Sequence, residues 1–441
     1  TSRIPSSRHT GPHTMTSSIS SSPSELASAA ADAVDPTALV ESLRSAIAIP
    51  SVTSNEGDFA AWVHKQLNTT AWDKTELALF GDNRANVYAR VGNAGPSVVL
   101  AGHLDTVHAH DWTSHWAGTD RADPYGAQII ENEIWGRGSA DQKAGVCAIL
   151  EALRAIHRTG HRPKGTVQAL FVSDEESGQP NSGISAGMKH ALATNQISTQ
   201  QLPDFLIYTE PTTSAIYTAQ MGFCIADITL TGKSAYFGRP ELGIDALKAG
   251  HQLLSALWAH SEALRQQPAH HLIGEAFLLI TEVHAGESIA VPGKFQLSLI
   301  RKVLPHENLD EVSVAIRNIT AEVAEAHGVQ STVDFTAPRD HLVGGTADET
   351  DVDHPAVQAL GNSISAVTGN APRIEAAPYW SEKSFLSALG IPGVYFAAGD
   401  IAHAHTPHER VHIDELVAAT RTLAHFVASW CGLEPAQPNN K

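Results

Sequence analysis

The feature that most constrains the fold is a series of four short apolar runs, each bounded by polar or glycine-rich turns. These runs cover residues 87–91, 97–101, 167–172 and 205–208. Helical patterns of apolar residues, such as residues 145–157, alternate with them. Strands and helices that alternate in this way are typical of an α/β fold. We therefore predict a mixed central sheet with helices on both faces.

The length of the chain indicates more than one domain, because 441 residues exceed the size at which a single core usually keeps growing. From residue 221 the pattern changes to strand, helix, two strands, helix and strand, the order of a ferredoxin-like α+β domain. We predict that residues 221–336 form an inserted domain and that residues 35–220 and 337–441 form the catalytic domain. Residues 1–34 are rich in Ser, Thr, Pro and Ala, and are predicted to be a disordered tail.

Charge and composition exclude several classes of partner. The formal net charge of -18 argues against nucleic acid and against anionic membrane surfaces. No apolar stretch is long enough to span a membrane, and no secretory signal is evident. Three cysteines stand far apart without a paired spacing, which is typical of a reducing compartment. We expect a cytoplasmic protein.

A histidine and a carboxylate follow the second apolar run. His103 and Asp105 are two residues apart, so in an extended segment their side chains share a face. A metal-bound imidazole usually has its other ring nitrogen hydrogen-bonded to a carboxylate or a carbonyl, and Asp105 could serve in this way. An ordinary hydrogen bond at the strand end is the alternative for this pair taken alone.

Further candidate ligands occur at the ends of other predicted elements. Asp141 follows a glycine-punctuated turn, where it could instead cap the next helix. The acidic run at residues 174–176 could be a solvated turn, and His405 could be a surface histidine. Glu210 directly follows an apolar strand and precedes a proline, which directs it to the open end of the sheet.

Taken together, these residues supply two imidazoles and several carboxylates at one edge of the sheet. Nitrogen and oxygen ligands without thiolate suit zinc, manganese or cobalt, and a shared carboxylate can bridge two such ions. An unligated glutamate beside such a pair could act as general base and then as general acid.

The order and spacing of these runs resemble the cocatalytic-metal aminoacylase and carboxypeptidase family. This family includes acetylornithine deacetylase, succinyl-diaminopimelate desuccinylase and the glutamate carboxypeptidases. The resemblance covers nearly everything after the tail and implies a zinc-peptidase-like catalytic domain. It also implies an insert that serves as lid and dimerisation domain, a homodimer, and two divalent metal ions per chain.

The resemblance also implies roles for individual residues. The implied metal ligands are His103 and Glu210 for one ion, Glu176 and His405 for the other, and Asp141 as the bridge. Asp105 would orient His103, and Glu175 would be the general base. The peptide bond between Asp141 and Gln142 is expected to be cis, as it often is in relatives.

The sequence departs from the family pattern in the insert. Most relatives carry a histidine in a Gly-x-x-x-His-x-x-x-Pro run that reaches the active site of the partner subunit, and here Tyr236 takes its place. A phenol still donates a hydrogen bond but has no positive charge at neutral pH, and Tyr236 could instead pack as an aromatic residue. The arginine that holds a substrate carboxylate in relatives matches either Arg301 or Lys302, and the sequence does not decide which of the two it is.

Aromatic residues are concentrated near the expected site entrance. Trp112 and Trp116 follow the first motif, and Tyr379 and Trp380 precede a predicted helix. They could belong to the core, or they could favour an aromatic or bulky substrate.

Three functions are consistent with these features. The first is a two-metal hydrolase that cleaves an amide-type C–N bond in a small carboxylate-bearing substrate, as an N-deacylase or an exopeptidase. The second is hydrolytic deamination of an aromatic amine, as in 5-nitroanthranilate aminohydrolase. The third, a binding module without activity, is disfavoured because every implied ligand and the implied base are present.

Overall fold

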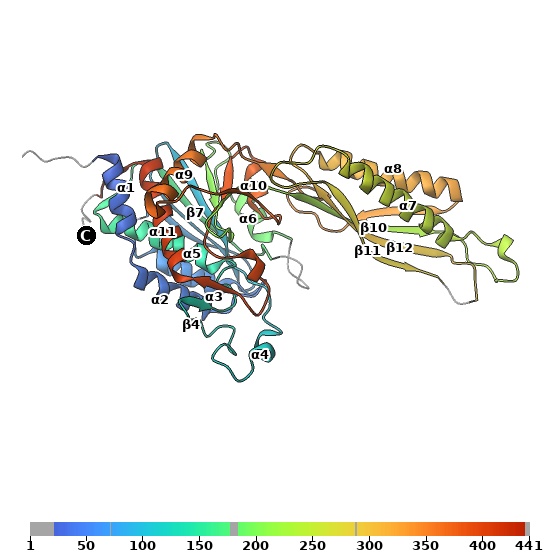
Figure 1. Ribbon diagram of the computed structural model, residues 1–441, viewed down its shortest axis with the longest axis horizontal. Helices are drawn as coiled ribbons and strands as arrows, with labels where there is room; N and C mark the ends of the chain where they lie inside the picture. Colours follow the sequence, from blue (N-terminus) through green and yellow to red (C-terminus); the bar gives the residue numbers. More distant parts are fainter. Residues whose placement is uncertain (1–21, 71, 177–183, 287–288, 437–441) are drawn as a thin grey trace, which may run out of the picture.

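The computed structural model describes residues 22–70, 72–176, 184–286 and 289–436. Figure 1 shows a compact body built around one sheet, from which a second, elongated sheet with two helices extends to one side. Within the described residues, no helix combines the length and apolar character needed to cross a membrane. The cytoplasmic location stays a prediction.

The body contains a nine-stranded mixed sheet, with the order β1-β2-β7-β3-β8-β17-β9-β15 and with β16 beside β9. Its central strands β7, β3 and β8 are parallel, whereas β1 and β2 run antiparallel at one edge. The strands are β1 (Lys74–Gly81), β2 (Arg84–Val91), β3 (Ser97–His103), β7 (Thr166–Val172), β8 (Leu206–Tyr208), β9 (Ile216–Gln220), β15 (Asp348–Glu349), β16 (Ile374–Ala377) and β17 (Gly393–Tyr395). The predicted mixed α/β sheet is confirmed.

Helices cover both faces of this sheet, and β3 shows why. Val98 and Leu100 point to one face and Val99 and Ala101 to the other, and all four are buried. The first face packs on α1 (Pro23–Asp32), α2 (Pro36–Ile47), α3 (Gly57–Leu67), α5 (Lys143–Arg158), α9 (Pro355–Thr368) and α11 (Ile413–Cys431). The second face packs on α6 (Ala186–Ala193) and α10 (Lys383–Ser387).

Smaller elements complete the body. A three-stranded sheet contains β4 (Gln128–Ile130), β5 (Glu133–Trp135) and β18 (Arg410–His412), and a two-stranded sheet contains β6 (His161–Pro163) and β19 (Leu433–Pro435). The short helices are α4 (Trp112–His115), η1 (Pro240–Leu242) and η2 (Ile401–His403), of which η1 lies in the insert.

The prediction of a disordered tail is wrong for residues 23–34. Ser22 and Glu25 form a capping box at the start of α1, in which each side chain accepts a hydrogen bond from the backbone N–H of the other residue. Ala27 and Ala30 are fully buried on the body, so the small side chains allow close helix packing. Residues 1–21 of the predicted tail lie outside the described residues.

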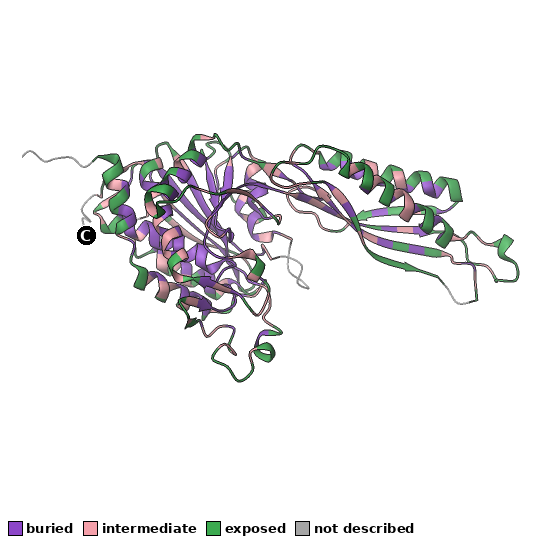
Figure 2. Cartoon of the chain, in the orientation of Figure 1, coloured by how far each residue is buried: buried purple, intermediate pink, exposed green. Residues whose placement is uncertain are grey.

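The second sheet has the order β11-β12-β10-β13, with the short β14 paired to β10. Its elements are β10 (Gly222–Thr231), α7 (Ala246–Arg265), β11 (Phe277–Ala285), β12 (Lys294–Val303), α8 (Leu309–His327), β13 (Gln330–Phe335) and β14 (Gly344–Gly345). Figure 1 shows α7 and α8 on one face of this sheet, and Figure 2 shows that buried residues alternate along its strands. The boundaries of the insert stay a prediction; β14 lies beyond its predicted end.

Candidate metal centre

The parallel strands of the body bring the predicted ligands to one edge of the sheet. His103 is the last residue of β3, and its register partner in β7 is Val172. The acidic run at residues 174–176 follows β7, and Glu210 follows β8, which pairs with the other side of β3. Side chains after neighbouring parallel strands meet at their carboxyl ends, so these residues lie together.

His103 has the tautomer that a metal ligand needs. Its Nδ1 donates to the backbone carbonyl of Asp105 at 2.9 Å, and its Nε2 faces Asp141 Oδ1 at 3.0 Å and Glu210 Oε1 at 3.7 Å. Burial alone would lower the pKa of His103, but Glu210 and Asp141 raise it well above the usual value. Because Nδ1 is the donor to the carbonyl, a cation can replace the proton on Nε2 and bind the lone pair of that nitrogen.

His405 approaches the same carboxylate from the opposite side. Its Nε2 lies 2.9 Å from Glu176 Oε1 and 3.2 Å from Asp141 Oδ2. Asp141 and Glu176 together raise the pKa of His405 to about 11. The two oxygens of Asp141 therefore face two different imidazoles, which is the arrangement of a bridging carboxylate.

Buried groups hold the backbone of Asp141 in place. Glu409 Oε1 accepts hydrogen bonds from the N–H groups of Ala140 at 3.2 Å and Asp141 at 3.0 Å, and Arg137 is paired with the same carboxylate. The Asp141–Gln142 peptide is cis, as expected. Glu409 was not predicted; its position four residues after His405 was the available signal.

Asp105 acts through two different groups. Its carbonyl accepts from the His103 ring, whereas its carboxylate oxygens accept from the backbone N–H groups of Glu175 at 3.1 Å and Glu176 at 3.0 Å. Thr53 Oγ1 donates to the same carboxylate at 2.9 Å. Asp105 thus connects the orientation of the first imidazole to the position of the acidic turn.

Glu175 differs from the other carboxylates of the centre. Ligand atoms of Glu175, His103 and Glu210 lie within 4.8 Å of one another, yet within the described residues no imidazole or cation forms an ion pair with Glu175. Burial, followed by the charge of Glu210, raises its pKa well above the usual value. An unpaired carboxyl with a raised pKa is suited to proton transfer.

The donor set fits a pair of divalent cations. The centre contains more buried carboxylates than imidazoles, and burial raises the pKa values of Glu175, Glu176 and Glu210. This excess of negative charge raises the free energy of the folded chain, and bound cations would relieve the repulsion. One bridging carboxylate, two imidazoles and two flanking glutamates supply ligands for both ions.

The sequence matches the family described as Peptidase family M20/M25/M40 over residues 99–429. The chain belongs to this family. It is therefore a hydrolase of the metallopeptidase and deacylase type, which acts on amide C–N bonds, and the family resemblance seen in the sequence is confirmed.

Individual relatives agree with this assignment. Succinyl-diaminopimelate desuccinylase of Gluconacetobacter diazotrophicus is 27% identical over 402 residues, covering 88% of this chain and 96% of the relative. The aminopeptidase PepT of Bacillus cereus has the same fold, with a TM-score of 0.71 at 16% identity over 90% of this chain and 99% of that one. The YXEP protein of Bacillus subtilis, a dinuclear metal binding peptidase from the M20 family, matches with a TM-score of 0.63 at 16% identity over 89% and 97% of the two chains.

Two predicted substrate-binding residues of this M20 chain lie beside the centre. The Tyr379 hydroxyl donates to the carbonyl of Pro211 at 3.5 Å, directly after Glu210. Trp380 contacts Phe223 of β10 edge-to-face, with ring centres 5.7 Å apart. The next residue, Ser381, donates to Glu210 at 3.2 Å, so this segment borders the carboxylates.

The predicted residues of the insert make their contacts within the insert. Arg301 is buried and paired with Glu307, and Lys302 donates to the carbonyl of Ile273 at 2.8 Å. Tyr236 is 63% exposed and its ring contacts Phe237. The structure thus brings none of these three predicted residues to the carboxylates of the metal centre in the same chain.

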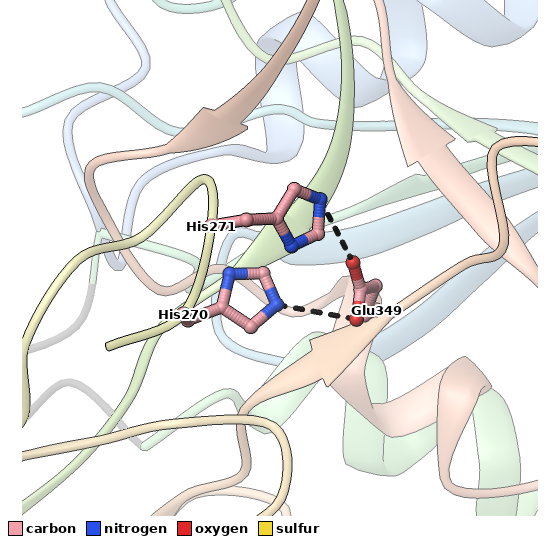
Figure 3. Close-up of side chains that lie close together, drawn as sticks. All are labelled: His270, His271 and Glu349. Atoms are coloured by element: carbon pink, nitrogen blue, oxygen red, sulfur yellow. Dashed lines mark ion pairs between the residues drawn. The ribbon is translucent and has the colours of Figure 1, made fainter. Parts of the chain in front are cut away.

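A second cluster of histidines and a carboxylate lies between the insert and the body (Figure 3). His270 Nε2 lies 3.1 Å from Glu349 Oε2, and His271 Nε2 lies 3.7 Å from Glu349 Oε1. His270 Nδ1 accepts from the backbone N–H groups of Leu272 and Ile273, both at 3.2 Å. A neutral His270 therefore carries its proton on Nε2, toward Glu349, and joins the loop after α7 to β15.

Proposed function

We propose that the chain is a two-metal hydrolase that cleaves an amide-type C–N bond of a small carboxylate-bearing substrate, as an N-deacylase or a metallo-exopeptidase. The single observation that carries the proposal is the placement of Asp141, whose two oxygens face His103 and His405 separately. Glu175, which forms no ion pair within the part of the chain that the structure describes, supplies the proton-transfer group that hydrolysis needs.

Each side chain of the centre has a defined part in this proposal. His103 and Glu210 would hold one ion, Glu176 and His405 the other, and Asp141 would bridge them. A pair of divalent ions supplies Lewis acidity at the scissile carbonyl and makes water easier to deprotonate.

Glu175 moves the proton in this proposal. Its carboxylate takes the proton from the attacking water and later gives it to the leaving nitrogen, so the same group is base and then acid. Burial and the charge of Glu210 raise the pKa of Glu175 in the metal-free chain, and within the described residues no ion pair occupies its carboxyl group.

A substrate panel tests the function. Protein incubated with zinc, manganese or cobalt is assayed with N-acyl amino acids, dipeptides and substituted anthranilates. We expect turnover of an N-acyl amino acid or a dipeptide, and none without metal. Turnover of anthranilates alone would contradict the amide assignment.

We further propose that the preferred substrate is aromatic or bulky. Tyr379 and Trp380 border the carboxylates, and Phe223 extends this aromatic surface toward the insert. The kcat/KM for aromatic N-acyl amino acids should therefore exceed that for aliphatic ones of the same acyl group, and the reverse order would contradict this preference.

We propose a homodimer formed through the insert. The strand β11 is at an edge of the second sheet, and Leu279 and Val283 are exposed on it, at 54% and 44%. Tyr236 is also exposed on the insert, where it would be free to reach the centre of a partner. Sedimentation equilibrium of the protein should give twice the mass of one chain, and a Leu279→Lys variant should give one.

A further inference from the structure

The first acid of the run at residues 174–176 is a buried ion-pair partner. Asp174 Oδ1 lies 3.1 Å from Nη2 of Arg84, the first residue of β2, and Asp174 Oδ2 accepts a hydrogen bond from the backbone N–H of Ala186 at 2.8 Å. The side chain of Asp174 is 0% exposed and that of Arg84 is 11% exposed, so water screens their attraction only weakly. The residue that follows Asp174 is Glu175, the proposed general base.

The backbone of Asp174 needs this support. Its φ is 74°, in the left-handed region that residues other than glycine seldom adopt and that persists where the surroundings hold it. The chain has just left β7 at this point, so the rotation at Asp174 determines the direction in which the side chain of Glu175 extends. A group that fixes Asp174 therefore also fixes the base.

Arg84 is itself held in a single orientation. Its Nε donates to Glu56 Oε2 at 3.1 Å and its Nη2 donates to Glu56 Oε1 at 2.9 Å, which is the two-bond contact of a planar fork. Glu56 lies directly before α3, has a fully buried side chain, and accepts a hydrogen bond from the backbone N–H of Ser54 at 2.8 Å. The Nη2 group of Arg84 thus contacts two buried carboxylates, a geometry that the single ammonium of a lysine does not reproduce.

The backbone is also held before and after Asp174. Before it, Oδ1 of Asn86, on the same strand β2, accepts a hydrogen bond from the N–H of Ser173 at 3.2 Å. After it, the Asp105 carboxylate accepts from the N–H of Glu175 at 3.1 Å. Both acceptors are buried, so the turn is held by groups that are themselves fixed in the core.

We propose that Arg84 is a positioning residue of the hydrolase, which fixes the left-handed turn at Asp174 and so directs the carboxylate of Glu175 toward the reacting atoms. The inference rests on the proposed function and deepens it, because it assigns the orientation of the base to an ion pair outside the set of metal ligands. A base must lie within hydrogen-bond reach of the proton that it takes, so a displacement of the turn lowers the rate of the chemical step.

The neighbouring metal ligand has separate contacts. The backbone N–H of Glu176 donates to Asp105 at 3.0 Å, and its carboxylate lies 2.9 Å from Nε2 of His405. Loss of the Arg84 fork should therefore disturb the base more than the bound metals.

A double-mutant cycle tests the inference. Arg84→Lys keeps one positive charge but loses the fork, and it is made in the wild type and in Glu175→Gln, each loaded with zinc and assayed with N-acetylphenylalanine. In the wild type it should lower kcat by about 10- to 100-fold with KM and metal content unchanged. In Glu175→Gln it should lower kcat by less than about twofold, because the group through which it acts is gone.

A matched control is available on α5. Arg158 also makes a two-bond contact with a fully buried glutamate, Glu151, at 2.6 and 3.1 Å. Arg158→Lys is therefore the same chemical change at a buried carboxylate outside the metal centre, and it should leave kcat at the wild-type value. Hydrogen exchange supplies a readout besides activity: the amides of residues 173–176 should exchange faster in Arg84→Lys and at the wild-type rate in Arg158→Lys.

The outcomes separate this inference from the proposed function. Wild-type turnover in Glu175→Gln would refute the base and the inference together. Low turnover in Glu175→Gln combined with wild-type turnover in Arg84→Lys would overturn the inference alone. Equal losses from Arg84→Lys in both backgrounds, or a loss of bound zinc, would show that Arg84 supports the fold or the metals and does not act through Glu175. If the wild type does not hydrolyse N-acetylphenylalanine, exchange decides, and unchanged exchange in Arg84→Lys overturns the inference.

Discussion

Two clusters of histidine and carboxylate in this molecule look alike in composition but differ in one hydrogen bond. At the centre, His103 Nδ1 donates to a backbone carbonyl, so Nε2 can bind a cation. At the junction, His270 Nδ1 accepts from two backbone N–H groups, so Nε2 keeps a proton in the neutral ring. The distances from Nε2 to the carboxylates are similar in the two clusters. The hydrogen-bond partner of Nδ1 therefore distinguishes a candidate metal ligand from a contact between the insert and the body.

The two clusters also differ in charge. The centre collects Asp141, Glu175, Glu176 and Glu210 around two imidazoles, whereas Glu349 stands opposite two histidines by itself. Only the first cluster has negative charge in excess, so only there would divalent cations relieve repulsion. The following predictions test this contrast, beginning with the largest expected effect.

Glu175→Gln should reduce kcat by about 10²- to 10⁴-fold, because it removes the group proposed to transfer the proton. Metal content, measured by mass spectrometry, should remain that of the wild type, since Glu175 is not a proposed ligand. Glu349→Gln is the matched change in the second cluster and should leave kcat close to the wild-type value. Unchanged turnover in Glu175→Gln would refute the base assignment.

His103→Ala should remove bound metal, whereas His270→Ala should not. A ligand that binds only the folded state stabilises it by about 2.7 kcal/mol at one hundred times its Kd. The rise in Tm on addition of zinc should therefore shrink in His103→Ala and persist in His270→Ala. Equal zinc responses in the two variants would show that the tautomer argument is wrong.

Zinc affinity should rise with pH by more than about tenfold per unit between pH 7 and 8, because bound ions displace the protons of both His103 and His405, whose pKa values are raised in the metal-free chain. The pKa of His405 is about 11 in the metal-free chain, so it is protonated throughout that range. Burial and Asp141 also raise the pKa of Glu176, so at lower pH a further proton must leave and the slope should steepen. Competition with a chromophoric chelator measures the slope, and a pH-independent affinity would contradict it.

His270→Ala should lower the free energy of unfolding by about 1 to 2 kcal/mol, because it leaves the N–H groups of Leu272 and Ile273 without their acceptor. His271→Ala should have almost no effect, since that side chain is 70% exposed and its pair with Glu349 is solvated. Urea unfolding of the metal-free protein measures both. Equal effects would indicate that the pair with Glu349, not the backbone contact, provides the stability.

Much of the centre could be predicted because strand ends are local features of the sequence. His103, Glu176 and Glu210 each follow an apolar strand, and parallel pairing brings such positions together. The contact that Asp105 makes through its carbonyl could not be predicted, because it depends on the path of the chain after β3.

Two features of the structure have signals in the sequence that composition and family alignment do not show. The alternation along β12 places Arg301 on the same buried face as Leu297 and Leu299, and Glu307 is near enough in sequence to be its partner. Ser22 and Glu25 form a recognisable capping box, which outweighs the tail-like composition around α1. In both cases the pattern of side chains is more informative than the composition of the segment or its alignment with the family pattern.

The distribution of the ligands along the chain has a consequence for biosynthesis. His103, Asp141, Glu176 and Glu210 are all translated before the second sheet, but His405 and Glu409 follow it. A nascent chain that has emerged only as far as the insert can therefore assemble one half of the centre, with neither His405 nor the Glu409 support for Asp141. Hydrolysis would then begin only after the last part of the body has left the ribosome, so an incomplete chain could not cleave amides in the cell.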